Sequence, residues 1–545
     1  MTDISFFENV RTGGQACARA VAAVALAAAV SAASADEAAM TKARAKVARV
    51  FADNMVLQRE KPVRIWGWAQ NGTKIAVAFD GQVKETVAAD GKWSATLDPM
   101  KASKVGRELK VSVNGQDGVS ITNVLVGEVW ILSGQSNMQW SMTGTDDYTN
   151  ALKRADYPTM RYMFGQDGAL ATAPADDFPG VKWVETKPGV LGRYSGTGFY
   201  FGERIMLDLD VPVGLVMTAC GATSMANWTP YDWMAKLPYQ KRYLERYERE
   251  SAEWVRTNGF AGACRAHAKA VEKYAEDVFK AKTGKGKWPW PPPGVPLAFT
   301  GWRSNLVPAL HYNSKIAPLA GFSCRGVLWF QGETEGWCWN ERDPGWNFGD
   351  MLELMIKSWR AAWGEDLWFV IAQLPSMAAN NHGRPVIRVK QREVSKRLSN
   401  VGVANITDTG WKDDVHPHDK KPIGERLARV ARRRVYGDKS VALTPEYESA
   451  EFQPGRAVVT FASETKLFAR GEGIGRGFEL KVAGKWSPAA KAELVDGKAV
   501  VSAADPAAKV EGVRYLWDSW DKPNVWIYDE QGVPVNSFSE PFEIQ

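Results

Sequence analysis

Residues 45–119 alternate between apolar and polar side chains and are broken repeatedly by glycine. Runs such as 63–68 and 74–79 have the period of two that turns one face of a β-strand toward a core. Asn-Gly and Asp-Gly pairs, of which Asn71-Gly72 is the first, supply the residues that tight hairpin turns need. The pattern predicts an antiparallel β domain, a small sandwich, over residues 36–122.

From about residue 123 short apolar runs alternate with amphipathic segments. The runs that predict strands are 126–132, 211–218, 326–330, 367–373 and 401–406. The segments with helical periodicity are 198–209, 350–363, 384–398 and 419–435. Strand–helix alternation is typical of a parallel sheet covered by helices on both faces. We therefore expect an α/β domain over residues 123–436, with its chemistry beyond the carboxyl ends of the strands.

Residues 236–300 interrupt this alternation. The part up to residue 287 is rich in Lys, Arg, Glu and Ala and predicts a charged helical insertion, and the proline-rich stretch that follows predicts an extended segment. Runs typical of β-strands return after Tyr436. Residues 437–545 are therefore expected to form a second β module.

Residues 1–35 have the composition of a secretory signal peptide. Arg11 and Arg19 precede an apolar, alanine-rich stretch, and Ala33-Ser34-Ala35 offers a small-residue cleavage site. No later run of the sequence reaches the roughly 20 apolar residues that a bilayer crossing needs. We expect a secreted or periplasmic protein without a membrane span.

Charge and cysteine content narrow the class further. The net charge of +6 over 545 residues is small, and the basic residues are scattered, which disfavours nucleic-acid binding. Outside the leader the cysteines are Cys220, Cys264, Cys324 and Cys338, without the C-x-x-C spacing of a zinc site. They permit three disulfide connectivities, and the pairing stays open. The oligomeric state is not predicted.

Ser136 and His416 are the candidate nucleophile and base. Ser136 follows the strand expected at 126–132 on a tight turn between small and polar residues, where a serine can present its hydroxyl at the edge of a sheet. His416 follows the last expected parallel strand and has Asp413 and Asp414 just before it, so that a carboxylate can orient its ring. Taken singly, Ser136 also fits an ordinary turn serine and His416 an ordinary loop histidine.

Two further residues follow expected strands. Gly221 comes after the strand at 211–218 and can donate a backbone N–H to an oxyanion. Gln331 closes the strand at 326–330 and can donate its side-chain amide. Alone, each is equally a turn glycine or a structural amide. The ordered set, with each member at the end of a strand of one sheet, favours a serine hydrolase site.

Three motifs together resemble the sialate O-acetylesterase family within the SGNH (GDSL-like) hydrolases: Gly-Gln-Ser-Asn-Met at 134–138, Trp-Phe-Gln-Gly-Glu at 329–333 and Asp-Asp-Val-His-Pro at 413–417. Segments 51–58, 313–319 and 513–517 extend the resemblance from about Val47 to the C-terminus. It implies a three-layer α/β/α SGNH-hydrolase domain with a parallel sheet, flanked by N- and C-terminal β-sandwich-like modules.

Carried over to this chain, the resemblance makes Ser136 the nucleophile, His416 the base, and the Ser136 and Gly221 amides with Gln331 the oxyanion hole. Asp413 has the usual SGNH spacing to the histidine and is the first choice for the acid. Asp414 is the alternative, because members of the acetylesterase family often keep the carboxylate two residues before the histidine. No metal or other cofactor is implied.

The candidate substrate-binding residues are Gln135, Asn137, Glu333 and Trp228. The indoles of Trp228, Trp337 and Trp339 either stack on sugar rings or pack beneath loops. The expected partner is an O-acetylated glycan or sialoside, and the expected activity is removal of the acetyl group through an acyl-enzyme. Alternatives are an esterase for acetylated xylan or mannan and a non-catalytic carbohydrate-binding protein on the same scaffold. A peptidase is disfavoured, because no peptidase motif is visible.

Overall fold

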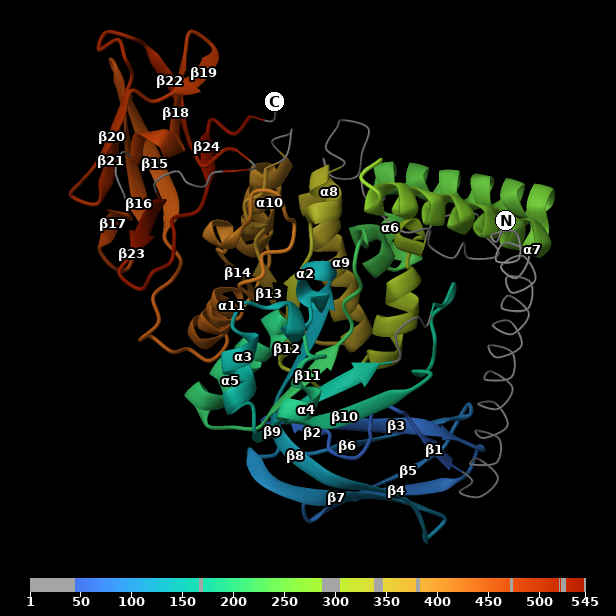
Figure 1. Cartoon of the computed structure of the whole chain (residues 1–545). Helices are drawn as coiled ribbons and strands as arrows, with labels where there is room; N and C mark the ends of the chain where they lie inside the picture. The colour runs from blue at the N-terminus through green and yellow to red at the C-terminus, as the bar shows by residue number, and fades with distance from the viewer. Residues whose placement is uncertain are drawn as a thin grey trace.

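The computed structural model describes residues 45–165, 170–286, 304–337, 347–378, 383–470, 474–518, 520 and 526–543. Figure 1 shows a β-rich N-terminal region, a central region in which helices surround a sheet, and a β-rich C-terminal region beside it. The predicted mixed α/β class is confirmed, with additional β-rich sheets after the central region. The predicted leader at 1–35 lies outside the described residues.

The N-terminal region consists of two groups of strands, which are antiparallel except that β2 pairs in parallel with β8. One sheet has the order β1-β3-β6, and in the other group β4 pairs with β5 and β7, and β7 with β8. The bounds are β1 Ala45–Val47, β2 Val56–Gln58, β3 Val63–Ala69, β4 Lys74–Phe79, β5 Gln82–Val87, β6 Lys92–Leu97, β7 Ser103–Val113 and β8 Gln116–Gly134. The first half of β8 pairs with β7, and the second half enters the central sheet. One continuous strand therefore crosses the expected boundary at residue 122 and ends beside Ser136.

The central sheet has the strand order β10-β9-β11-β8-β12-β13-β14. All neighbours are parallel except the edge pair β10 and β9. The bounds are β9 Tyr157–Gly165, β10 Val181–Thr186, β11 Val213–Met217, β12 Gly326–Phe330, β13 Trp368–Ala372 and β14 Val401–Ala404. The strand runs expected from the sequence correspond to β8, β11, β12, β13 and β14, whereas β9 and β10 were not predicted.

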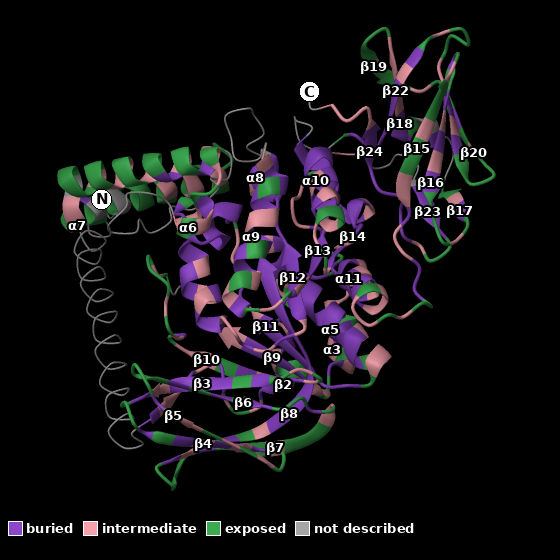
Figure 2. Ribbon diagram, turned by 180° about the vertical axis from the view of Figure 1, so that it is seen from behind, coloured by how far each residue is buried: buried purple, intermediate pink, exposed green. Residues whose placement is uncertain are grey.

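Helices pack on this sheet through two separate apolar clusters. Alternate residues of a strand point to opposite faces, so that Leu132 and Leu328 pack with helices α5 and α11, and Ile131 and Trp329 pack with α9 and α10. The bounds are α5 Gly196–Leu209, α9 Phe348–Trp363, α10 Gly383–Arg397 and α11 Lys421–Arg434. Figure 2 shows the buried residues concentrated in the strands and on the helix sides that face them. The four expected helices are therefore confirmed to within two residues at each end.

Short helical segments connect these elements. Their bounds are α2 Ser136–Gln139, η1 Met142–Gly144, α3 Tyr148–Arg154, α4 Pro188–Leu191, η2 Met225–Trp228, α6 Tyr231–Met234, η3 Ser304–Leu306, η4 Tyr312–Ile316, η5 Ala317–Leu319, α8 Glu333–Trp337 and η7 Thr407–Thr409. Helix α7, Pro238–Lys282, fills most of the region expected to be a charged helical insertion, with a kink at Gly259. The proline-rich stretch that follows it lies outside the described residues. Among those residues, no helix is both long and apolar enough to cross a membrane.

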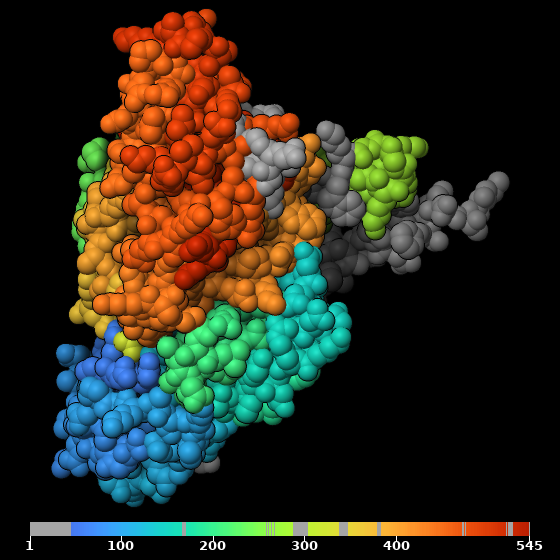
Figure 3. All heavy atoms as spheres, turned by 90° about the vertical axis from the view of Figure 1, so that its left-hand side faces the viewer, coloured from blue at the N-terminus to red at the C-terminus, as the bar shows by residue number. Residues whose placement is uncertain are grey.

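The C-terminal region contains three antiparallel sheets around a core of its own. Their orders are β15-β16-β21-β20, β17-β23 and β19-β18-β22-β24. The bounds are β15 Glu446–Gln453, β16 Arg456–Ala462, β17 Leu467–Arg470, η8 Ile474–Gly477, β18 Phe478–Val482, β19 Lys485–Pro488, β20 Lys491–Val495, β21 Lys498–Ser502, β22 Val510–Tyr515, β23 Trp526–Asp529 and β24 Phe538–Glu540. In Figure 3 the C-terminal sheets cover one end of the molecule and the N-terminal strands the other.

Candidate active site

Three adjacent strands bring the candidate site residues to one edge of the central sheet. In the ladder Met217 of β11 pairs with Leu132 of β8, and Phe330 of β12 pairs with Gly134 at the end of β8. The segments that follow these strands carry Gly221, Ser136 and Gln331. The parallel register therefore places the first three parts of the predicted site next to one another.

Gly134 shapes the turn on which Ser136 stands. It has a φ of +116°, which L-residues with a side chain rarely adopt. A Cβ added there would lie 2.2 Å from the carbonyl oxygen of Phe330. Glycine is therefore required where β8 meets β12. Ser136 begins the short helix α2, so that its backbone N–H has no acceptor within the helix.

The long segment after β14 returns to this edge and carries His416. Nε2 of His416 lies 2.8 Å from Oγ of Ser136, across 280 positions of sequence. The imidazole stacks on the indole of Trp140, with ring centroids 4.7 Å apart and 23° between the planes. Trp140 also stacks on His418, at 5.3 Å. The predicted meeting of nucleophile and base is present, and Trp140 is a ring support that the sequence did not indicate.

Asp414, and not Asp413, faces the second nitrogen of the imidazole. Oδ1 of Asp414 lies 3.4 Å from Nδ1 of His416 and accepts the backbone N–H of His416 at 2.8 Å. Oδ2 of Asp414 lies 3.3 Å from Nε2 of His418. Asp413 is exposed and contacts no polar group of any described residue. In the structure Asp414, the alternative acid of the sequence analysis, is therefore the carboxylate beside His416, and Asp413, the first choice, is exposed to solvent.

His416 is suited to act as a neutral base. Burial of the ring, followed by the positive charge of Lys420, holds the pKa of His416 below its usual range. The carboxylate of Asp414 acts in the opposite direction and raises this pKa, but it does not outweigh the other two effects. At neutral pH Nε2 can therefore accept a proton from the Ser136 hydroxyl.

Gly221 lies directly beside the nucleophile. A Cβ added to it would lie 3.4 Å from Cβ of Ser136. Its N–H donates to Oε1 of Gln139 at 2.8 Å, and Gln139 is exposed at the surface. A side-chain carbonyl oxygen therefore occupies the donor that was predicted to hold an oxyanion.

The amide of Gln331 is committed elsewhere. Its Nε2 donates to the carbonyl of Thr223 at 3.3 Å and to the carboxyl group of Glu335. Glu335 is buried, and burial raises its pKa to about 7. The Glu335 carboxyl also accepts the N–H of Met225 at 2.6 Å. In the structure the Gln331 amide, which was predicted to serve the oxyanion, instead joins the loops after β11 and β12.

Asn137 and Glu333 lie beneath the site and do not face a substrate. Nδ2 of Asn137 donates to Oε1 of Glu333 at 2.5 Å and to the carbonyl of Val415 at 3.0 Å. Oδ1 of Asn137 accepts from Nζ of Lys420 at 2.5 Å. All three side chains are buried. The two residues that were predicted to bind substrate thus form a buried cluster with Lys420, a residue that the sequence analysis did not single out.

Trp228 is fully buried, and its indole N–H donates to Oγ1 of Thr223 at 2.9 Å. It packs in the core and cannot stack on a sugar. Of the two alternatives for this indole, the structure therefore shows packing and not sugar stacking. The side chain of Trp337 and all of Trp339 lie outside the described residues. Gln135 is buried as well, but it differs from the other predicted substrate contacts in its amide. Its Oε1 accepts the backbone N–H of Gly332 at 3.4 Å, and its Nε2 donates to no described residue.

Cys264 and Cys324 are free thiols. Cys324 is buried and Cys264 is exposed, neither of them in a disulfide, and Cys338 lies outside the described residues. Burial raises the pKa of the Cys324 thiol to about 12, so that it stays protonated. Within the part of the chain that the structure describes, no group of three His, Cys, Asp or Glu side chains could hold a metal ion.

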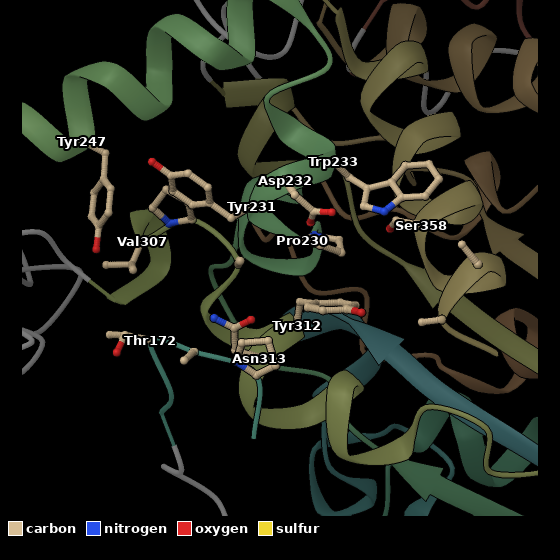
Figure 4. A pocket seen from close by; sticks show the side chains of 16 residues that line it. Thr172, Pro230, Tyr231, Asp232, Trp233, Tyr247, Val307, Tyr312, Asn313 and Ser358 are labelled. Atoms are coloured by element: carbon tan, nitrogen blue, oxygen red, sulfur yellow. The ribbon is translucent and has the colours of Figure 1, made fainter. Parts of the chain in front are cut away.

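A cavity of about 670 Å³ lies away from this edge of the sheet, between α6, α7 and α9. Figure 4 shows the rings of Tyr231, Tyr247 and Tyr312 around it. Neither Ser136 nor His416 lines it. The candidate chemistry therefore belongs to the sheet edge and not to this cavity.

Comparisons with known proteins agree with the motifs. The family described as "carbohydrate esterase, sialic acid-specific acetylesterase" matches residues 126–258. The sialate O-acetylesterase of Rattus norvegicus is 25% identical over 519 residues, which cover 86% of this chain and 89% of the relative. That of Homo sapiens is 23% identical over 524 residues, or 87% and 88% of the two chains.

Among solved structures, a carbohydrate acetylesterase from Xanthomonas citri superposes with a TM-score of 0.73 at 25% identity. The superposition covers 91% of this chain and 99% of that one. Together with the sequence matches, it confirms the resemblance to the sialate O-acetylesterase family that the three motifs predicted.

Proposed function

We propose that this chain, a carboxylic ester hydrolase related to the sialate O-acetylesterases, removes O-acetyl groups from a carbohydrate through an acetyl-enzyme on Ser136. The observation that carries the proposal is the 2.8 Å approach of His416 Nε2 to Ser136 Oγ. It supports a base that takes the proton of the nucleophile directly.

In the first half-reaction Oγ of Ser136 bonds to the acetyl carbonyl carbon, and its proton passes to Nε2 of His416. The tetrahedral oxyanion is held by the N–H groups of Ser136 and Gly221 after Gln139 leaves the latter. The intermediate then collapses, the bond to the sugar oxygen breaks, and His416 returns the proton to that oxygen. The sugar leaves, and the acetyl group stays on Ser136.

In the second half-reaction His416 takes a proton from water, and the resulting hydroxide attacks the acetyl carbon. The bond to Oγ breaks, His416 returns its proton to Ser136, and acetic acid leaves and ionises to acetate in solvent. Throughout, Asp414 orients Nδ1 of His416 and stabilises the imidazolium. Gln135, whose Nε2 lacks a described acceptor, is the side chain we assign to contact the substrate.

We further infer an SGNH-type three-layer arrangement for the central domain. The separate apolar clusters on the two sides of the central sheet support it. We also infer export of the chain, on the strength of the leader composition at 1–35. N-terminal sequencing of the exported protein tests this inference: a first residue of Asp36 supports it, and an intact Met1 contradicts it.

The proposed activity is tested by acetate release from O-acetylated sialosides, acetylated xylan and acetylated mannan, with Ser136→Ala as the matched blank. We expect release from at least one glycan with the unaltered protein and none above background with the variant. Release from xylan alone would reassign the sugar and leave the chemistry in place. Equal release by both proteins would contradict the role of Ser136.

A further inference from the structure

Beneath the nucleophile, one side-chain amide joins four separate segments of the chain. Asn137 belongs to α2, Glu333 to α8, Val415 to the loop of His416, and Lys420 immediately precedes α11. The Asn137 amide bonds to all three partners, at 2.5, 3.0 and 2.5 Å respectively. The position of Ser136 relative to His416 therefore depends on this amide.

The charges in this cluster are not paired directly. The Lys420 ammonium donates to the amide oxygen of Asn137, and the Glu333 carboxylate accepts from the amide nitrogen. No ion pair joins the two among the described residues, and Oε2 of Glu333 is buried without a partner. A buried ammonium without a contacting carboxylate is costly. Its position beneath the reacting groups therefore calls for a functional reason.

Lys420 is close enough to His416 to act on its charge. Nζ of Lys420 lies 5.7 Å from the ring centroid of Trp140, the indole on which His416 stacks. The charge of Lys420 is the second cause, after burial, of the lowered pKa of His416. Burial in turn lowers the pKa of Lys420 to about 7, so that the ammonium is present in the mildly acidic range where a histidine ordinarily gains its proton.

The other ionisable groups around His416 act differently. Asp414 raises the pKa of His416, and His418, on the same loop, lowers it less than Lys420 does. Helix α2 contributes no charged side chain, and Glu333 of α8 acts through Lys420 by raising the pKa of that lysine. Lys420 is therefore the main charge that opposes protonation of the imidazole.

We propose that Lys420 is a positioning residue: through Asn137 it fixes the Ser136 turn against the His416 loop, and its charge keeps His416 in the base form under mildly acidic conditions. The inference rests on the proposed function and extends it to the pH range of activity. It assigns two separable contributions to Lys420, a hydrogen bond to Asn137 and a positive charge.

Three substitutions separate these contributions. Lys420→Met removes both, Lys420→Gln keeps a donor for Asn137 without the charge, and Lys420→Arg keeps the charge. Lys421→Met is the matched control, because Lys421 is the next residue, is partly exposed and lies 4.0 Å from Asp147. Each protein is assayed with p-nitrophenyl acetate between about pH 5 and pH 9, after circular dichroism has shown that it is folded.

We expect Lys420→Met to lower kcat about 10- to 100-fold, as misplaced reacting groups do, and to move the acid limb of kcat/KM to higher pH. Lys420→Gln should have a higher kcat than Lys420→Met, but its acid limb of kcat/KM should stay at the higher pH. Lys420→Arg should keep the limb of the unaltered protein, and Lys421→Met should match that protein throughout. If Lys420→Met does not fold, the comparison of Lys420→Gln with Lys420→Arg still tests the proposal. Identical acid limbs for Lys420→Gln and Lys420→Arg would overturn the proposal.

Titration of the His416 imidazole by NMR provides a readout that does not depend on esterase activity. We expect it to titrate at higher pH in Lys420→Gln than in the unaltered protein or in Lys421→Met. An unchanged titration would overturn the charge contribution even if the enzyme is active. A changed titration in a protein without acetate release would instead uphold the role of Lys420 and count against the proposed function.

Discussion

Two buried charge clusters lie at the two ends of the part of β8 that pairs with β11, and they are built differently. At the start, Glu128 is fully buried and contacts Arg59 Nε at 2.6 Å and Arg325 Nε at 2.8 Å. Just beyond the other end, Asn137 separates Lys420 from Glu333. The first cluster pairs opposite charges directly, and the second keeps them apart with an amide.

The comparison shows how a buried charge serves stability in one place and chemistry in another. Burial alone would raise the pKa of Glu128, but hydrogen bonds and charge from Arg325 and Arg59 hold it below its usual range. These groups form ion pairs with one another and join the N-terminal strands to the central sheet. At the other end the Lys420 charge is not neutralised by contact, so that it still acts on His416. We therefore expect substitutions at the first cluster to change stability and substitutions at the second to change catalysis.

The largest effect is expected at the catalytic end, from Asp414→Asn. Loss of the carboxylate beside Nδ1 should lower kcat about 10²- to 10⁴-fold, because the imidazolium loses its partner and its orientation. Stability should change little, since Asp414 is partly exposed. Kinetics with p-nitrophenyl acetate measure the effect. Asp413→Asn is the control, and its kcat should stay within about twofold of that of the unaltered protein, because the side chain lies at the surface. A larger loss of kcat in Asp413→Asn than in Asp414→Asn would make Asp413 the acid.

The next effect is expected at the structural end, from Glu128→Gln. It removes the buried carboxylate that pairs with Arg59 and Arg325, and it should lower the free energy of unfolding by about 3–5 kcal/mol. The kcat of the folded fraction should stay the same. Urea unfolding measures the change. Glu60→Gln is the matched control, because Glu60 contacts the same two arginines from an exposed position and should cost less than about 1 kcal/mol. Equal decreases in the free energy of unfolding for Glu128→Gln and Glu60→Gln would show that the buried ion pairs of Glu128 do not stabilise the fold more than exposed ones do, and would contradict the comparison of the two clusters.

A smaller, pH-dependent effect is expected at Glu335, which adjoins the catalytic cluster. Burial raises its pKa to about 7 in the folded protein, above the ordinary 4.5. Its contribution to stability is therefore complete below about pH 4.5 and is lost as the pH rises through 7, by on the order of 3 kcal/mol. Glu335→Gln should remove this loss. Thermal unfolding between about pH 5 and pH 8 measures this loss of stability. If stability depends on pH in the same way in Glu335→Gln and in the unaltered protein, the prediction is wrong.

The smallest effect is expected from Gln139→Ala. The Gln139 oxygen occupies the Gly221 N–H, and a substrate must displace it. One hydrogen bond contributes about 0.5–1.5 kcal/mol, so that removing the competitor should raise kcat/KM for p-nitrophenyl acetate about two- to tenfold. A 100-fold decrease in kcat/KM would mean instead that Gln139 itself assists the reaction.

The sequence was sufficient for the periodic elements and for the residues at the strand ends. Strand β12 and helix α5 follow from clean apolar patterns, and Ser136, Gly221 and His416 follow because parallel strands end at one edge. Strands β9 and β10, at one side of the central sheet, mix polar and apolar residues without a clear period. They were missed because their pairing, of β9 with β11 and of β10 with β9, determines them, and the local pattern does not.

The buried polar groups could not be assigned from sequence. Lys420 lies among His418, Asp419 and Lys421, in a stretch that is typical of a solvated surface. Only the fold brings it beneath Asn137. Likewise the choice between Asp413 and Asp414 depends on a single turn, in which Asp414 accepts the N–H of His416. Such contacts are set by tertiary packing, and sequence spacing does not encode them.

The central claim is that Ser136 is made nucleophilic by His416. Intact-mass and peptide-mass measurements after treatment with a fluorophosphonate, which phosphonylates activated serines, test it most directly. We predict one adduct per chain, on Ser136, and loss of labelling in His416→Gln. An adduct on a different serine, or an active protein that takes up no label, would contradict the account.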